Sequence, residues 1–109
     1  MPQKPKLKYT LTIPHGVTVT SLRVWGTILD TQDIMQGAQP EVGKFAGTIE
    51  FQSLDRKLVI ELLSVGVPNR EVVFNFTTPS GTKVYAEDQE MLVKSNGRGH
   101  FYDDQAQYP

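Results

Sequence analysis

The sequence contains no cysteine among its 109 residues. This absence excludes disulfide bonds, zinc sites built from thiolates, and catalysis by a cysteine nucleophile. The chain also lacks an apolar run near the ~20 residues that cross a bilayer as a helix, and its opening MPQKPKLKYT lacks the apolar centre of a signal peptide. We therefore expect a cytoplasmic protein that does not associate with a membrane.

An excess of charge of either sign is also missing. Eleven Lys plus Arg residues stand against twelve Asp plus Glu residues, which gives a net charge of −1. Such a balance provides no general attraction to a phosphate backbone or to anionic lipid. Nucleic acid is therefore not an expected partner, and recognition of any partner must depend on local features.

The residues and motifs of common enzymes are scarce. The sequence has no GxSxG, no HExxH and no phosphate-binding glycine loop, and its only histidines are His15 and His100. A metal site or a histidine-dependent hydrolase would need both histidines to converge from distant parts of the chain. We predict no catalytic residue, no metal site and no cofactor, and we keep the histidine-dependent hydrolase as the least favoured function.

What the sequence does contain is a strand pattern. In KLKYTLTI, residues 6–13, large apolar residues alternate with lysines and threonines, which is typical of a strand buried on one face. Similar strand-forming segments occupy residues 17–29, 44–51, 57–65 and 70–78. These segments predict an all-β protein.

The second of these segments changes phase. Its apolar residues switch from odd to even positions within residues 17–29, which predicts a β-bulge near Thr20 or Ser21. The same switch leaves Trp25, the single tryptophan, on the face opposite Val24. Trp25 is therefore a candidate binding residue, with a buried core position as the alternative.

Two further segments leave alternatives open. KLVIELLSV, residues 57–65, is almost continuously apolar, so it is either covered on both faces or presents its second face to a partner. A homodimer through an exposed strand would satisfy the second alternative. Residues 83–95 fit two short strands or one helix, and we favour the strands.

These segments define the predicted fold class. About seven to eight strands joined by short connections predict an antiparallel barrel or a two-sheet sandwich, with one long loop at residues 30–44. The length suits one domain, which we place at residues 6–104. We expect a flexible N-terminus at residues 1–5 and a frayed C-terminal tail at residues 105–109.

The stretch SNGRGHFYDD, residues 95–104, gathers polar residues behind two glycines and could be a site or a turn. Asn-Gly is a strong hairpin signal, and we interpret the stretch as a hairpin turn followed by a strand. In that strand His100, Tyr102 and Asp104 share a face, with His100 and Asp104 roughly 13 Å apart, too far to bind one metal ion. His100 and Tyr102 are kept as candidate binding residues.

We predict a non-catalytic binding or interaction module that presents the loop at residues 30–44 on a rigid β scaffold. Ile34 and Met35 are the apolar residues of this otherwise polar loop, so they join Trp25, His100 and Tyr102 as candidate binding residues. The partner is a protein or a small molecule whose identity the sequence does not reveal.

The alternative function is an up-and-down barrel that holds a small apolar molecule inside. Short connections and a set of inward aromatic residues favour it. These residues are Tyr9, Phe45, Phe51, Phe74 and Phe76. The same side chains could instead fill the interior of so small a protein completely.

Overall fold

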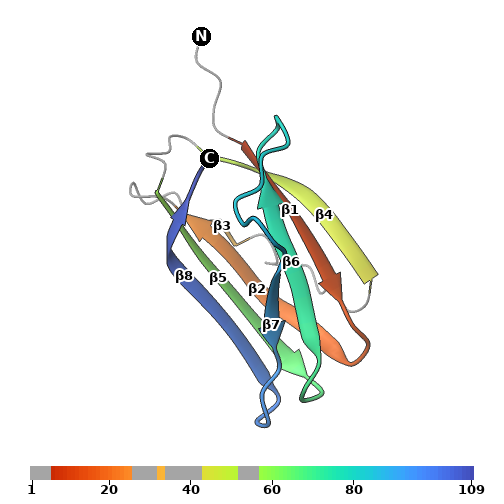
Figure 1. The fold of residues 1–109 in the computed structure, drawn as a ribbon. Helices are drawn as coiled ribbons and strands as arrows, with labels where there is room; N and C mark the ends of the chain where they lie inside the picture. Colours follow the sequence, from red (N-terminus) through yellow and green to blue (C-terminus); the bar gives the residue numbers. More distant parts are fainter. Residues whose placement is uncertain (1–5, 26–31, 34–42, 52–56) are drawn as a thin grey trace.

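The computed structural model describes residues 6–25, 32–33, 43–51 and 57–109, and these residues form eight strands (Figure 1). The strands are β1 (Lys6–Ile13), β2 (Val17–Trp25), β3 (Gln32–Asp33), β4 (Gly43–Glu50), β5 (Lys57–Gly66), β6 (Glu71–Thr77), β7 (Gln89–Leu92) and β8 (Arg98–Gln107). The strand predicted from the alternation at residues 6–13 is confirmed as β1.

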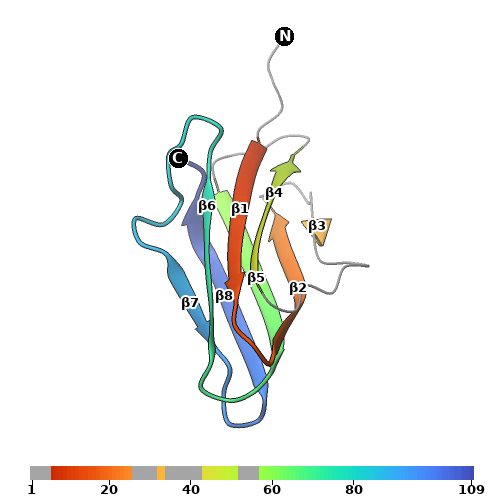
Figure 2. The ribbon, with the colours of Figure 1, turned by 90° about the vertical axis from the view of Figure 1, so that its right-hand side faces the viewer.

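The strands form two antiparallel sheets of four. Sheet A has the order β4-β1-β6-β7, and sheet B has the order β3-β2-β5-β8. Figure 2 shows sheet A in front of sheet B, with the two layers facing each other. The all-β antiparallel fold class is therefore confirmed, and the arrangement is consistent with a two-sheet sandwich.

The order of the strands differs from an up-and-down meander. The short turns after β1, β5 and β7 each lead from one sheet to the other, so the strands that they join do not pair. The turns after β1 and β5 also contact each other, because the Val67 N–H donates to the carbonyl of Gly16 at 2.9 Å. The up-and-down order on which the apolar-carrier alternative depends is thus not the observed one.

The space between the sheets is filled by apolar side chains from both. The fully buried residues include Phe51, Phe74 and Phe76, and Tyr9 and Phe45 pack against them. Burying each large side chain of this kind stabilises the fold by roughly 1.5–3 kcal/mol. The aromatic residues that the carrier alternative assigned to a ligand are therefore part of the core.

The β-bulge predicted in β2 is confirmed between Val19 and Ser21. Val17 and Val19 face the core before the bulge, and Leu22 and Val24 face it afterwards. The extra residue reverses the phase, so both halves of one strand bury their apolar residues. As a result Trp25, next to Val24, points away from the core.

The connection between β6 and β7 is held by one buried amide. The Asn75 side chain accepts from the Tyr85 N–H at 3.3 Å and donates to the Tyr85 carbonyl at 3.0 Å and to Asp88 Oδ1 at 2.9 Å. After the bond that the Val84 N–H donates to the Phe76 carbonyl at 2.8 Å, these side-chain bonds hold the segment up to Asp88 in place of a backbone ladder. The prediction of two short strands here is correct for β7 and wrong for the first, which forms only a bridge between Lys83 and Thr77.

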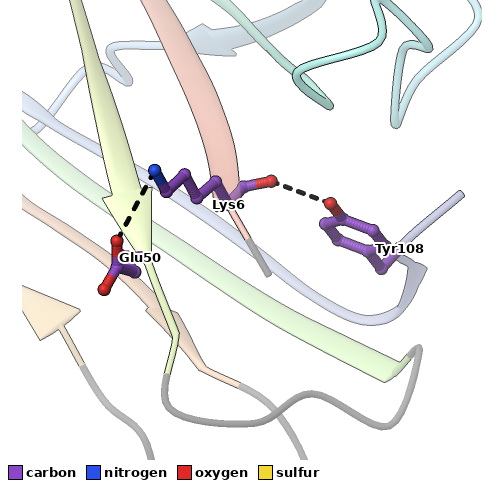
Figure 3. Close-up of polar contacts among 3 residues, drawn as sticks. All are labelled: Lys6, Glu50 and Tyr108. Carbon is purple, nitrogen blue, oxygen red and sulfur yellow. Dashed lines mark hydrogen bonds and ion pairs between the residues drawn. The ribbon is translucent and has the colours of Figure 1, made fainter. Parts of the chain in front are cut away.

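The C-terminal segment differs from the expected frayed tail. β8 continues to Gln107, and Ala106 is buried opposite Leu58. The Tyr108 hydroxyl donates to the Lys6 carbonyl at 2.9 Å and so ties the end of sheet B to sheet A (Figure 3). The first residues of β5, Lys57 and Leu58, pair with Gln107 and Ala106. The C-terminal segment is therefore held by a partner strand that its own composition did not indicate.

Lys6 also contacts the neighbouring strand in sheet A. Its Nζ lies 3.8 Å from Glu50 Oε2 (Figure 3). The expected flexible N-terminus, residues 1–5, lies outside the described residues. Among the described residues there is no helix with the length and apolar character needed to cross a bilayer.

Candidate functional site

Three of the five candidate binding residues lie on one surface, the outer face of sheet B. Directly opposed residues of neighbouring strands share a face, and the register opposes Trp25 to Val59, Tyr102 to Glu61 and His100 to Leu63. Trp25 therefore lies on β2 at one side of β5. His100 and Tyr102 lie on β8 at the other side. Ile34 and Met35 lie outside the described residues.

The predicted loop at residues 30–44 is described only in part. Residues 32–33 form β3, which pairs with β2 at Arg23 and Val24 at one side of sheet B. Residues 43–44 belong to β4 in sheet A. The loop prediction thus misses a short strand, and residues 34–42 lie outside the described part of the chain.

Apart from Glu61, the outer face of β5 from Val59 onward is apolar, and it is open along half of its length. Val59 is 8% exposed, but Leu63 is 37% exposed and Val65 is 44% exposed. The first alternative for this strand, burial on both faces, therefore holds only for its beginning. On β8, Tyr102 is 53% exposed beside them. The sequence left both alternatives open for residues 57–65, because an apolar run looks the same whether or not something covers it.

Polar contacts hold the centre of this face. The Arg23 guanidinium lies 5.5 Å from the centroid of the Trp25 ring, which is a cation–π geometry. His100 Nε2 lies 3.1 Å from Glu61 Oε2. Glu61 is opposed to Arg23 of β2 in the register of the sheet, and its carboxylate contacts His100 of β8. These contacts orient Trp25 and His100.

A cleft of about 440 Å³ opens on the same face, toward the end of β5. Leu63 and Val65 supply its apolar wall, and Lys94 and Arg98 supply positive charge. The remaining lining residues are Thr20, Ser64, Asn96, Gly99 and His100. No carboxylate is among these lining residues, so the cleft suits an apolar group that carries a negative charge.

The rim of the cleft is formed by the turn before β8. The Gly97 N–H donates to the Lys94 carbonyl and the Lys94 N–H donates to the Arg98 carbonyl, each at 2.9 Å. Asn96 Oδ1 accepts from the Arg98 N–H at 3.0 Å, and Gly97 adopts φ +79°, which favours glycine. The turn prediction is confirmed, but the hairpin is wrong because β7 and β8 belong to different sheets.

A serine, a histidine and a glutamate meet near the cleft, so a hydrolytic triad has to be considered. Ser64 is opposed to Gly99, which places its side chain on the inner face, whereas His100 and Glu61 are on the outer face. Ser64 is 2% exposed, and its hydroxyl has no hydrogen-bond partner among the described residues. Nucleophile and base thus point to opposite faces, and the three residues do not form a triad.

Gly99 is required by this close packing. A Cβ added at Gly99 would lie 2.3 Å from Ser64 Oγ, well inside van der Waals contact. Glycine therefore lets β8 approach the Ser64 side chain beneath the cleft. The glycine-rich stretch of the sequence serves a turn at Gly97 and packing at Gly99.

The inner face of β8 is held tightly, in contrast to its outer face. The Tyr85 hydroxyl donates to Asp103 Oδ2 at 2.7 Å, and the Phe101 ring meets Phe74 edge-on at 4.7 Å. Burial raises the pKa of Tyr85, and the hydrogen bond and charge of Asp103 raise it further. These contacts fix β8 from behind and leave His100 and Tyr102 on its outer face.

The histidines do not form a metal centre in the described part of the chain. His15 lies in the turn after β1, where its carbonyl accepts from Arg70, and His100 contacts Glu61. The described residues contain no group of three or more His, Cys, Asp or Glu that could hold a metal ion. The described side chains of this face are apolar, aromatic and cationic, with the carboxylate of Glu61 among them.

A scan against protein-family models, a search of curated proteins and a search of solved structures each found no match to this chain. The geometry of the outer face of sheet B therefore carries the functional argument.

Proposed function

We propose that the protein is a non-catalytic binding module whose contact surface is the outer face of sheet B. The observation that carries this proposal is the grouping of exposed Leu63, Val65 and Tyr102 on two paired strands, beside half-buried Trp25. Single exposed apolar residues are normal on a protein surface, but a contiguous group on a rigid sheet is typical of an interaction site.

The cleft supports a partner of defined chemistry, an extended protein segment that combines apolar and acidic side chains. Leu63 and Val65 offer apolar contact, and Lys94 and Arg98 offer charge attraction to a carboxylate. A volume of about 440 Å³ accommodates one or two side chains of such a segment. The sheet beneath the cleft is rigid, so little ordering accompanies binding.

The loop at residues 30–44, with Ile34 and Met35, stays a second predicted contact surface. One described part of it, β3, pairs with β2 at Arg23 and Val24 and so belongs to sheet B. The cytoplasmic location and the absence of nucleic acid among the partners also stay predictions from the sequence.

The proposal is tested with a capped, fluorescein-labelled peptide, Gly-Leu-Asp-Leu-Asp-Gly, and the same peptide with Lys in place of Asp. Fluorescence anisotropy measures the affinity of each for the protein. We expect the Asp peptide to bind more tightly, because the cleft contains Lys94 and Arg98 but no carboxylate. Equal affinity for both peptides would contradict the assigned chemistry.

A matched pair of variants locates the binding surface. Leu63→Ser combined with Val65→Thr removes the apolar wall, and we expect about a tenfold loss of affinity for the Asp peptide. Leu92→Ser is the control, because Leu92 is 45% exposed on β7 of sheet A, close to the exposure of Val65. An equal loss in the control would show that the outer face of sheet B is not the binding surface.

A further inference from the structure

Among the described strands β8 ends sheet B, and one of its edges has no neighbouring strand there. It pairs with β5 on one side only and is ten residues long. The Lys94 N–H donates to the Arg98 carbonyl, so the backbone groups of Arg98 point away from β5. Because the direction alternates along a strand, the N–H and C=O groups of His100 and Tyr102 point to the same open edge.

On the side of β8 away from β5, the described residues form no hydrogen bond with the backbone groups of His100 or Tyr102. An exposed row of such groups is a template for pairing with another strand. The question is which strand fits it. The side chains along the edge of β8 determine which strand can pair there, because they have to match those of the incoming strand.

The outward side chains of β8 are complementary to their own reverse order. Along the strand they run Arg98, His100, Tyr102, Asp104, from a cation to an anion, and Asp104 lies where the register with β5 shifts between Leu58 and Ile60. A second copy in antiparallel orientation, centred on Phe101, would oppose Arg98 to the partner's Asp104 and His100 to the partner's Tyr102. A two-fold axis repeats each of these pairs, as an interface between identical surfaces requires.

We propose that two copies of this chain associate through their β8 edges, so that the two B sheets join into one continuous antiparallel sheet. The edge residues His100 and Tyr102 then exchange backbone hydrogen bonds with the partner's Tyr102 and His100. Phe101, which is partly buried at the end of the core, meets the partner's Phe101 across the axis. The 53% exposure of Tyr102 in the single chain is reduced at this seam.

The other long end strand, β4 of sheet A, fits a second copy less well. Its exposed residues also run from a cation to an anion, in the order Lys44, Ala46, Thr48, Glu50. Glu50, however, is already paired with Lys6, and the residues between the charges are small and include no aromatic group. β8 instead offers an exposed tyrosine and a histidine at the centre of its edge.

The inference goes beyond the proposed function, because it concerns the backbone edge of β8, although Arg98 and His100 of that strand also line the cleft. Its consequence for binding is an arrangement of two clefts on one joined surface, one on each side of the axis. Two linked sites bind a partner that has two matching segments more tightly than either site alone. Dimerisation itself needs no peptide and is measured without one.

The test is a charge exchange, followed by sedimentation equilibrium of the full chain over a range of concentrations. We expect the unmodified chain to associate to twice its 12.2 kDa mass. Arg98→Asp alone and Asp104→Arg alone place like charges opposite each other and should weaken the dimer about tenfold or more. Arg98→Asp combined with Asp104→Arg restores both pairs and should restore the dimer.

Two more variants complete the test. Tyr102→Pro removes an N–H that points away from β5, so it should abolish dimerisation while circular dichroism shows a folded chain. Lys44→Glu on β4 is the control and should leave the dimer unchanged. A monomer at every concentration, a dimer lost in the Lys44→Glu control, or a double exchange that folds and stays monomeric would overturn the proposal.

The two proposals fail independently. Asp104 does not line the cleft, so Asp104→Arg should keep the affinity for the Asp peptide while losing the dimer. A dimer without peptide binding would overturn only the proposed function. Peptide binding by a chain that is monomeric at every concentration would overturn only the β8 dimer.

Discussion

The outer faces of the two sheets differ in chemistry, although both sheets cover the same core. The outer face of sheet A presents exposed polar residues along β1 and β4, with one small alanine, which is also exposed, among them. These residues are Lys6, Lys8, Thr10, Thr12, Lys44, Ala46, Thr48 and Glu50. The outer face of sheet B presents Trp25, Leu63, Val65 and Tyr102 at corresponding outward positions.

The difference shows which residues the fold needs and which it does not. Inward positions of both sheets are apolar because they form the core, whereas outward positions are free to be polar, as they are in sheet A. The one large exposed apolar residue on β7, Leu92, is opposed to Glu71 and stands alone. The apolar group on sheet B therefore has no role in the core, and this is why we assign it to recognition.

The largest effect on stability is expected from a change in the core that both sheets share. Phe74→Ala deletes a fully buried ring that contacts Phe76 within sheet A and Phe101 across to sheet B. We expect a loss of about 3–5 kcal/mol in the free energy of unfolding. Urea denaturation measures it, and a loss below about 1 kcal/mol would show that the sheets do not share this core.

The next largest effect is confined to sheet B. Gly99→Ala places a Cβ against Ser64 Oγ and should destabilise the protein by about 1–3 kcal/mol. Ser64→Ala removes the obstructing hydroxyl, so the double variant should regain most of the lost stability. Urea denaturation of the three variants forms a double-mutant cycle. Additive losses would contradict the close contact.

A smaller effect on stability is expected at the hydrogen bond between Tyr85, in the connection from β6 to β7, and Asp103 of β8. Tyr85→Phe removes the hydrogen bond to Asp103 and should cost about 1 kcal/mol near neutral pH. The pKa of Tyr85 is raised in the fold, so its contribution is complete below pH 10 and is lost as the pH rises above that value. The stability of the variant should therefore fall less steeply above pH 10, as measured by thermal unfolding.

The smallest effect is expected from removing one glutamate charge on the outer face of each sheet. On sheet A, the hydrogen bond that protonated Glu71 donates to Glu90 and the charge of Glu90 raise the pKa of Glu71, so the fold gains stability from this pair below pH 4.5 and loses it as the pH rises through the raised pKa. Glu90→Gln removes the repulsion and should raise the melting temperature slightly at neutral pH, but not in acid.

Glu61→Gln on sheet B is the matched change. Glu61 contacts His100 and is opposed to Arg23, so its loss should lower the melting temperature at neutral pH. Opposite signs for the two glutamates would support the contrast between the faces. The same sign for both would show that their electrostatic surroundings are alike.

The sequence predicted individual strands better than their pairing. Alternation located β1, and the change of phase located the bulge after Val19, because both depend only on which side chains face the core. The partner of each strand depends on long-range packing, so the Asn-Gly turn at residues 96–97 looked like a hairpin although it joins two sheets. The buried bonds of Asn75 left no periodic signal at all.

The candidate site was predictable in its aromatic residues and not in its apolar ones. Trp25, His100 and Tyr102 stood out because their strands placed them away from the core, and register then brought them to one face. For Leu63 and Val65, the apolar run at residues 57–65 left two alternatives, burial on both faces or a face turned to a partner, because the sequence does not show what covers an apolar strand. Their exposure follows from β5 lying at the centre of a sheet with one open face.

The central claim, that the outer face of sheet B is the contact surface, is tested most directly by titrating the isotope-labelled chain with the Gly-Leu-Asp-Leu-Asp-Gly peptide and following its backbone amide resonances. We expect the largest shifts at Leu63, Val65 and Arg98, with the exposed positions of β1 and β4 unchanged. Shifts centred on β1 and β4, or the absence of shifts from sheet B at saturating peptide, would contradict the claim.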